Sequence, residues 1–177
     1  MDIKKRLSQR VGIKEIREIV NYSKGDSNKI KKIYNLLYDN DETIAFQAAW
    51  VMCHFSKTDN KWLLKKQNEL IDLLLICEHS GKRRLILNLL LKQQQTNPPR
   101  TDFLDFCMER MFSKKELPGV QTICIKLAYK LCCQIPELLN VYIQTLELSE
   151  PDLLHPSVRA VIKIYTQNMN KICTKYE

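Results

Sequence analysis

Two groups of basic residues have the types and spacing that favour binding of an anion. The first comprises Lys61, Lys65 and Lys66 around Trp62. Lys61 and Lys65 are four residues apart, so a helix places both ammonium groups on one face. Cations beside an aromatic ring bind a phosphate backbone or an acidic peptide. The alternative is a solvated face with Trp62 packed beneath it.

The second group is the segment Ser80-Gly81-Lys82-Arg83-Arg84, at the predicted start of a helix. Free N–H groups at a helix N-terminus, together with the cations Lys82, Arg83 and Arg84, would bind an anion. The alternative is a solvated turn. In that case the basic residues oppose the helix dipole at a cost of roughly a few tenths of a kcal/mol each.

Trp50 is the third candidate binding residue. Gln47, Trp50 and His54 share one face of the helix predicted over 42–56. Trp50 either packs against the partner helix, as buried aromatic residues do, or it is an exposed aromatic side chain that recognises a partner.

Motifs for catalysis and for metal binding are absent from the sequence. The four glycines are far apart, so there is no glycine-rich phosphate loop and no nucleophile elbow. Cys53 and His54 are adjacent and would point about 100° apart on a helix, and no cluster has the ligand spacing of a zinc site. We expect no catalytic residue, no metal and no cofactor; an enzyme with an unrecognised site is the lesser alternative.

The cysteines and hydrophobic segments indicate a cytoplasmic protein. Seven cysteines are present, no pair has C-x-x-C spacing, and most lie among aliphatic residues. We expect reduced thiols that pack in the core, the vicinal pair Cys132-Cys133 included. No apolar run approaches the roughly 18 residues of a membrane span, and the N-terminus does not read as a secretory signal. We expect no membrane binding.

The net charge of +8 is concentrated in the first part of the chain. Residues 1–100 contain 19 basic and 11 acidic side chains, whereas residues 101–177 contain nine of each. A basic half attracts nucleic acid, another polyanion or an acidic protein, or it serves solubility alone.

The elements that must position these residues follow a 38-residue repeat. One apolar pattern, with the spacing of a helical stripe, recurs at Ile44/Ala48/Val51/Phe55, Val120/Cys124/Leu127/Leu131 and Val158/Ile162/Tyr165/Met169. The same spacing marks positions 82, 86, 89 and 93, where Lys82 and Gln93 depart from the pattern. We therefore expect that copy to be locally rotated. Repeats of this length are typical of stacked helical hairpins.

The sequence predicts one domain over 1–177, formed of about nine helices in antiparallel pairs. A basic arm over 1–10 precedes them, and a break near Gln67-Asn68 is expected within the second pair. Gln93–Pro99 interrupts the third pair and is not taken as a domain boundary. The pairs span 13–38, 42–77, 81–113 and 118–148, and a closing helix spans 156–173.

Two segments, Asp41–Val51 and Pro156–Ile162, resemble the HEAT and armadillo class of helical repeats. Each has an acidic or proline-containing turn, then a β-branched residue and a stripe of small residues. The resemblance covers the chain from about residue 13. It implies an all-α superhelix, a short solenoid of the armadillo type.

We interpret the chain as a non-enzymatic helical-repeat scaffold that binds a protein or peptide. A nucleic-acid-binding module that uses the basic N-terminal half is the alternative, because such repeats serve unrelated functions. The candidate residues for binding a partner or an anion are Trp50, Lys61, Trp62, Lys65, Lys66, Lys82, Arg83 and Arg84.

Overall fold

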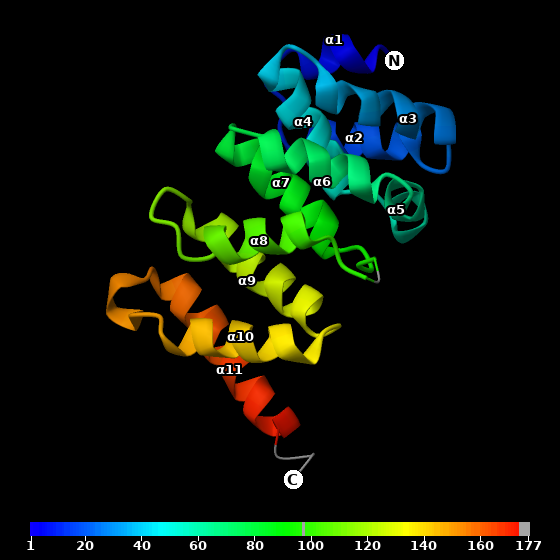
Figure 1. Ribbon diagram of the computed structural model, residues 1–177. Helices are drawn as coiled ribbons and strands as arrows, with labels where there is room; N and C mark the ends of the chain where they lie inside the picture. Colours follow the sequence, from blue (N-terminus) through cyan, green and yellow to red (C-terminus); the bar gives the residue numbers. More distant parts are fainter. Residues whose placement is uncertain (97, 174–177) are drawn as a thin grey trace. The chain divides into compact units, whose positions relative to one another are not determined.

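The structure is a computed structural model that describes residues 1–96 and 98–173. Within those residues every regular element is a helix (Figure 1). The contacts between residues divide the chain into two compact units, Met1–Gln94 and Gln95–Glu177. The helices expected to form the third pair therefore belong to different units.

The first unit contains seven α-helices and one short 3-10 helix. They are α1 (Ile3–Leu7), α2 (Ile13–Ser23), α3 (Ser27–Asn35), η1 (Leu36–Tyr38), α4 (Glu42–Cys53), α5 (Lys57–Leu64), α6 (Gln67–Ile76) and α7 (Ser80–Leu91). The basic arm thus includes a helix, α1, whose residues Ile3 and Leu7 are buried. The break expected near Gln67-Asn68 in the second pair lies at Lys65 and Lys66, between α5 and α6.

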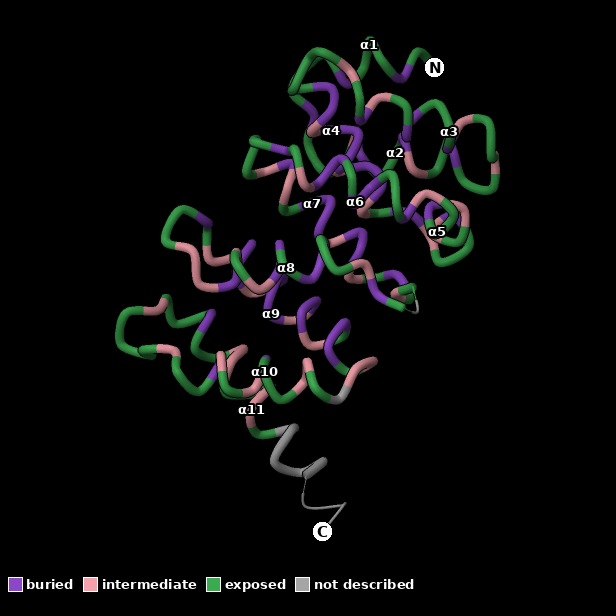
Figure 2. Tube along the Cα trace, in the orientation of Figure 1, coloured by how far each residue is buried: buried purple, intermediate pink, exposed green. Residues whose placement is uncertain are grey.

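Helix α4 is the centre of the first unit. It contacts α1, α2, α3, η1 and α7, and buried residues follow it in Figure 2. Asp41 begins the helix by accepting a hydrogen bond from the backbone N–H of Thr43 at 2.8 Å. Ala45, Ala48 and Ala49 are fully buried, and their small side chains allow neighbouring helices to approach closely.

The second unit is arranged around α9 (Pro118–Cys132), which contacts the other three α-helices of that unit. These are α8 (Thr101–Arg110), α10 (Pro136–Glu147) and α11 (Pro156–Cys173), and a 3-10 helix, η2 (Pro151–Leu153), precedes α11. Proline begins α9, α10 and α11, because a first-turn residue needs no N–H for the hydrogen bonds of the helix. Tyr142 of α10 is fully buried, and its hydroxyl donates to the carbonyl of Ile125 at 3.0 Å.

The predicted stripes are buried in α4 and α9, and Val158 is buried at the start of α11. In α11, Ile162 and Tyr165 are half-buried, and the side chain of Met169 lies outside the described residues. The expected rotation of α7 is wrong: positions 82, 86, 89 and 93 are all buried, with exposures of 6%, 0%, 1% and 6%. The stripe stays buried because Lys82 in α7 and Gln93, just after the helix, both bind polar partners.

Those partners lie on neighbouring helices of the first unit. The ammonium of Lys82 is 3.0 Å from Glu42 Oε1 at the start of α4. Gln67 of α6 donates from Nε2 to Gln93 Oε1 at 3.0 Å. A buried polar group that is hydrogen-bonded avoids most of its desolvation penalty. Lys82 and Gln93 can therefore be buried at the positions that the 38-residue spacing assigns to the apolar stripe.

Four cysteines, namely Cys77, Cys107, Cys124 and Cys132, are buried, as expected of core thiols. Cys53 is half-buried and Cys133 is exposed, so the prediction that the vicinal pair is buried holds for Cys132 and fails for Cys133. The side chain of Cys173 lies outside the described residues. None of the helices described has the length and apolar character that crossing a membrane requires.

Candidate functional site

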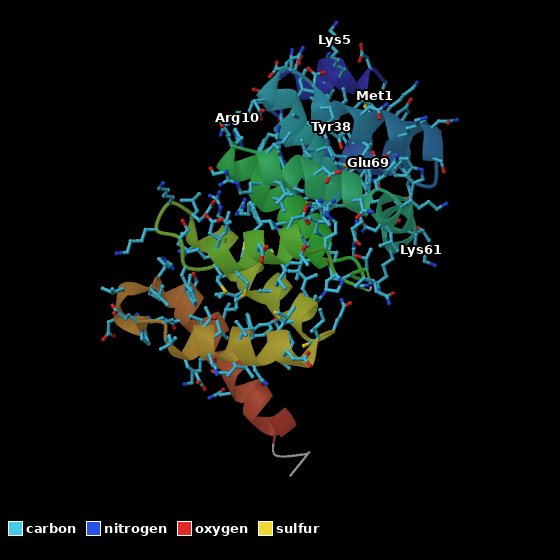
Figure 3. The ribbon with its side chains drawn as sticks, in the orientation of Figure 1. Met1, Lys5, Arg10, Tyr38, Lys61 and Glu69 are labelled. Carbon is cyan, nitrogen blue, oxygen red and sulfur yellow. The ribbon has the colours of Figure 1, made fainter. Side chains whose placement is uncertain are left out.

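The predicted lysine face lies on α5 and on the turn to α6. Lys61 and Lys65 are exposed, and Figure 3 shows Lys61 on the outer side of α5. Lys66 is engaged within the unit: its ammonium is 2.6 Å from Glu69 Oε1 and 5.8 Å from the centre of the Tyr34 ring. Trp62 is half-buried, with its ring edge-on to Tyr34 at 5.6 Å. Part of this face therefore packs within the unit.

Tyr34, Tyr38 and Glu69 form a polar cluster that links α3 and η1 to α6. The Tyr34 hydroxyl donates to Glu69 Oε2 at 2.9 Å and lies 3.0 Å from the Tyr38 hydroxyl. Figure 3 shows Tyr38 and Glu69 on the same side of the unit. Burial, with the two neighbouring groups, raises the pKa of Tyr34 well above its ordinary value. Hydrogen bonds from Lys66 and then Tyr34 lower the pKa of Glu69. The directions of both pKa shifts favour an ionised Glu69 and a protonated Tyr34, and the hydrogen bond between them links α3 to α6.

Most of the polar groups at the basic start of α7 bind partners within the first unit. His79 begins the helix, with Nδ1 accepting from the Lys82 backbone N–H at 3.0 Å. The Lys82 side chain is buried beside Glu42. Arg83 donates from Nε and Nη2 to the Cys77 carbonyl at 3.0 and 2.7 Å. Arg84 alone of the three predicted cations has an exposed side chain, and the anion site stays a prediction.

Trp50 lies at an open pocket of about 860 Å³ in the first unit. We call this hollow the Trp50 pocket. Helix α4 supplies one side of it, and the segment that connects α1 to α2, with the first turn of α2, supplies the other. The pocket is lined by Arg10, Val11, Gly12, Glu15, Thr43, Phe46, Gln47 and Trp50.

The aromatic side of the pocket is the face of α4 that is incompletely buried. Phe46 and Trp50 are both half-buried, one helical turn apart. The Phe46 ring lies 5.6 Å from the His79 ring, and a Cβ at Gly81 would come within 3.0 Å of a Phe46 ring carbon. Glycine at position 81 thus leaves room for Phe46 where α7 begins.

The opposite side of the pocket is fixed by Gln47. Its side chain is 3% exposed. The amide nitrogen donates to the carbonyls of Leu7 and Gln9 at 2.7 and 2.8 Å, and the amide oxygen accepts from the backbone N–H of Val11 at 2.8 Å. One side chain on α4 therefore holds the segment that carries Arg10 into the pocket lining.

The charged residues in the pocket lining are one cation, Arg10, and one carboxylate, Glu15. Arg10 is exposed. Glu15 accepts the Gly12 backbone N–H at 2.9 Å, and backbone N–H groups of Glu15 itself and Gly12 lower the pKa of this carboxyl. One turn beyond Trp50, burial raises the pKa of Cys53 to about 11, although the nearby charges of Lys92 and Arg84 oppose the rise.

Sequence reasoning identified Trp50 and missed the residues opposite it. Arg10, Gly12 and Glu15 lie more than 30 positions earlier in the chain, and no local spacing joins them to α4. A glutamine among alanines on an apolar helix was the available signal, because a polar residue at a core position requires partners. Among the described residues, no three side chains of the metal-ligating types gather in one place.

Comparison with families and known proteins agrees with the helical architecture. The family model of the HEAT repeat domain matches residues 3–169. Neither the curated proteins nor the solved structures give a significant match. The match spans nearly the whole chain, and all the regular elements of the described residues are helices. The chain belongs to the HEAT repeat domain family.

Proposed function

We propose that this protein is a scaffold that binds a segment of a protein or peptide partner in the Trp50 pocket. HEAT repeats generally mediate protein interactions. The observation that carries the proposal is the open face of α4. Seven residues of this helix are buried, while Phe46 and Trp50 are only partly buried at a pocket of about 860 Å³.

The dimensions and residue types of the pocket support a peptide contact. Sites for small ligands and side chains typically occupy roughly 300–1,000 Å³, which includes the volume found here. Tryptophan and arginine are enriched among the residues that contribute most to protein interfaces, and Trp50 and Arg10 both line this pocket.

The packing of α4 and the hydrogen bonds of Gln47 hold the pocket lining in place, and this also favours binding. Helix α4 is held on several sides by neighbouring helices, and Gln47 fixes the connecting segment with three hydrogen bonds. A surface that is ordered before binding loses less conformational entropy when a partner docks. The open face of α4 is thus presented on rigid elements.

Binding of nucleic acid is the second candidate, and the net charge of +8 supports it. A phosphate backbone is bound by a row of accessible cations. Several basic residues of the first unit are instead directed at their own chain: Lys66 at Glu69, Lys82 at Glu42 and Arg83 at the Cys77 carbonyl. The arrangement therefore favours a peptide over a phosphate backbone.

The two tryptophans of the chain provide a direct test. Trp62→Phe leaves Trp50 as the only fluorescent indole, and Trp50→Phe leaves Trp62. Peptides selected from a random display library against the wild-type protein would be titrated into both variants. We expect the emission to shift when Trp50 is the reporter and to stay constant when Trp62 is. A shift confined to Trp62, or a library that yields no binder, would count against the proposal.

A further inference from the structure

We propose that the first unit has a second binding surface, which binds the phosphate backbone of a double-stranded nucleic acid without regard to its sequence. Basic residues at the start of α7 bind their own chain, but another group of cations does not. We call this group the α3–α5 lysine surface. It shares no residue with the lining of the Trp50 pocket, so the inference does not rest on peptide binding there. Its members are exposed lysines, namely Lys24, Lys31, Lys57, Lys61 and Lys65.

Helix α5 and the residue that ends it supply the central row of this surface. Lys57, Lys61 and Lys65 follow one another at intervals of four residues, so they lie on one side of the helix, about 6 Å apart along its axis. Figure 3 shows Lys61 on the outer side of α5. The buried residues of the helix, Asp59 and Leu63, belong to the opposite side. The row is therefore directed at solvent.

Lys24 and Lys31 extend the surface from α5 to its neighbour α3. Gly25, the residue after Lys24, donates its backbone N–H to Asp59 Oδ1 at 3.1 Å, which fixes the turn before α3 against the first turn of α5. Lys31 is three residues before Tyr34, whose ring packs edge-on against a tryptophan of α5 at 5.6 Å. Both lysines are exposed, so they lie beside the row on α5 and are accessible with it.

The positive charge of this surface is not neutralised by neighbouring carboxylates. None of the five lysines forms an ion pair within the described residues. The acidic residues closest to them in the sequence are already engaged. Asp26 pairs with Lys29 at 3.3 Å, Glu69 pairs with Lys66 at 2.6 Å, and Asp59 is buried. Every exposed charged residue of α3 and α5 is a lysine.

The stability of α5 does not explain its lysine row. Like charges four residues apart on a helix repel each other, and a cation in the first turn, such as Lys57, opposes the helix dipole. A solvated helix face commonly carries both signs of charge. Features that weaken an element locally are expected at functional sites, and a bound polyanion would remove the repulsion within this row.

The residue types of the surface favour phosphate over the other polyanions of a cell. Lysine binds phosphate as a point charge, but it is depleted in protein interfaces, where arginine and aromatic residues are enriched. A helix that lies on a membrane inserts its apolar face. In α5, Leu63 is fully buried and Leu64 is the large apolar residue that is exposed, so the helix has too little apolar surface to insert.

The aromatic residue of α5 distinguishes a duplex from a single strand. Proteins that bind single strands combine cations with exposed aromatic rings on which the bases stack. Trp62 is half-buried and packs against Tyr34, and the exposed residues of α5 include no aromatic side chain. A surface of cations without a stacking ring fits a duplex, whose bases are already stacked and whose phosphates are outermost.

The test measures the fluorescence anisotropy of short labelled DNA and RNA duplexes, each in two unrelated sequences, over a range of salt concentrations. The competing probes are a single strand of the same length, polyglutamate, and vesicles of phosphatidylcholine with phosphatidylserine. The variant neutralises the row on α5, and the control neutralises three exposed lysines of the second unit, so both proteins lose the same net charge. The substitutions are Lys57→Gln, Lys61→Gln and Lys65→Gln in the variant, and Lys114→Gln, Lys115→Gln and Lys163→Gln in the control.

We expect the wild-type protein to bind both sequences of at least one kind of duplex with similar affinity. If all five lysines contact phosphates, the logarithm of the binding constant should fall with the logarithm of the salt concentration with a slope of about −4 to −5. The variant should bind about tenfold or more weakly at low salt, and its slope should be smaller in magnitude by about two to three. The control should keep the wild-type slope, and circular dichroism checks that both proteins are folded.

The other outcomes overturn the inference. Absence of salt-dependent binding to either duplex removes the ligand, and equal weakening in variant and control would assign the binding to net charge alone. Tighter binding of the single strand, or binding of polyglutamate or the vesicles without binding of a duplex, would assign the surface to another polyanion. Peptide binding at Trp50 is measured separately in the α5 variant, so its success or failure does not depend on these results.

Discussion

At the scale of single residues, buried polar side chains determine how the first unit is assembled. Gln47 satisfies three backbone groups of the segment before α2. Lys82 and Gln93 occupy positions of an apolar stripe and bond to Glu42 and Gln67. Each of these long polar side chains reaches another element. Its contribution to the stability of the unit therefore depends on a partner that is distant in the sequence.

Gln47→Leu should destabilise the first unit by about 2–4 kcal/mol, because it leaves two carbonyls and one N–H without their partner in a buried setting. Urea unfolding followed by circular dichroism measures this loss. Gln9→Leu is the matched control, since the Gln9 side chain is exposed, and it should change the free energy of unfolding by less than about 0.5 kcal/mol. Equal effects of the two changes would contradict the role assigned to Gln47.

Glu69→Gln tests the polar cluster through pH. The pKa of Glu69 in the folded protein is below its ordinary value of 4.5, so the ionised carboxylate stabilises the folded state. That contribution is present above the ordinary pKa and is lost as the pH falls through the lowered one. We expect the variant to be less stable than wild type at pH 7 and the difference to shrink near pH 3, in urea unfolding at both values.

The comparison for that experiment is Glu109→Gln, a change at an exposed position of α8. Its difference from wild type should be small at both pH values. A difference for Glu69→Gln that grows on acidification would show that the cluster stabilises the unit in another way.

At the scale of elements, the sequence predicts helix starts well and side-chain pairing poorly. Asp41 and the prolines at 118, 136 and 156 stand at the starts of α4, α9, α10 and α11, because capping depends on local chemistry. The orientation of α7 was mispredicted, because hydrophobic periodicity counts Lys82 and Gln93 as outward-facing. Only the distant partners Glu42 and Gln67 show that both residues are buried.

The pairing of α4 with α7 can be tested at Glu42. Glu42→Gln removes the carboxylate beside the buried ammonium of Lys82, and an uncompensated charge in a buried position is costly. We expect a loss of about 1–3 kcal/mol in the free energy of unfolding, measured by urea denaturation. Glu78→Gln, at an exposed residue just before α7, is the matched control.

A second variant distinguishes the charge from the packing. Lys82→Met in the Glu42→Gln background replaces the buried ammonium with an apolar side chain of similar length, so it should recover most of the lost stability. Failure to recover would mean that α4 and α7 depend on the ion pair itself.

At the scale of the whole molecule, the sequence predicted the class of fold and only part of the proposed binding surface. The 38-residue spacing indicated helical repeats, and the HEAT repeat domain model matches residues 3–169. Trp50 was singled out from its helix face alone. Arg10 and the connecting segment could not be assigned to the same site, since long-range hydrogen bonds through Gln47 bring them there. The cytoplasmic location stays a prediction.

The central claim, that the Trp50 pocket is where a partner binds, is tested most directly in the unmodified protein. At 20.9 kDa, the chain is suited to NMR, and its two tryptophans give two indole N–H signals. The signals are assigned with Trp50→Phe and Trp62→Phe, and a peptide selected against the wild-type protein from the random display library is then added. We predict that the Trp50 signal moves with peptide concentration and the Trp62 signal stays in place; a stationary Trp50 signal at saturating peptide would contradict the claim.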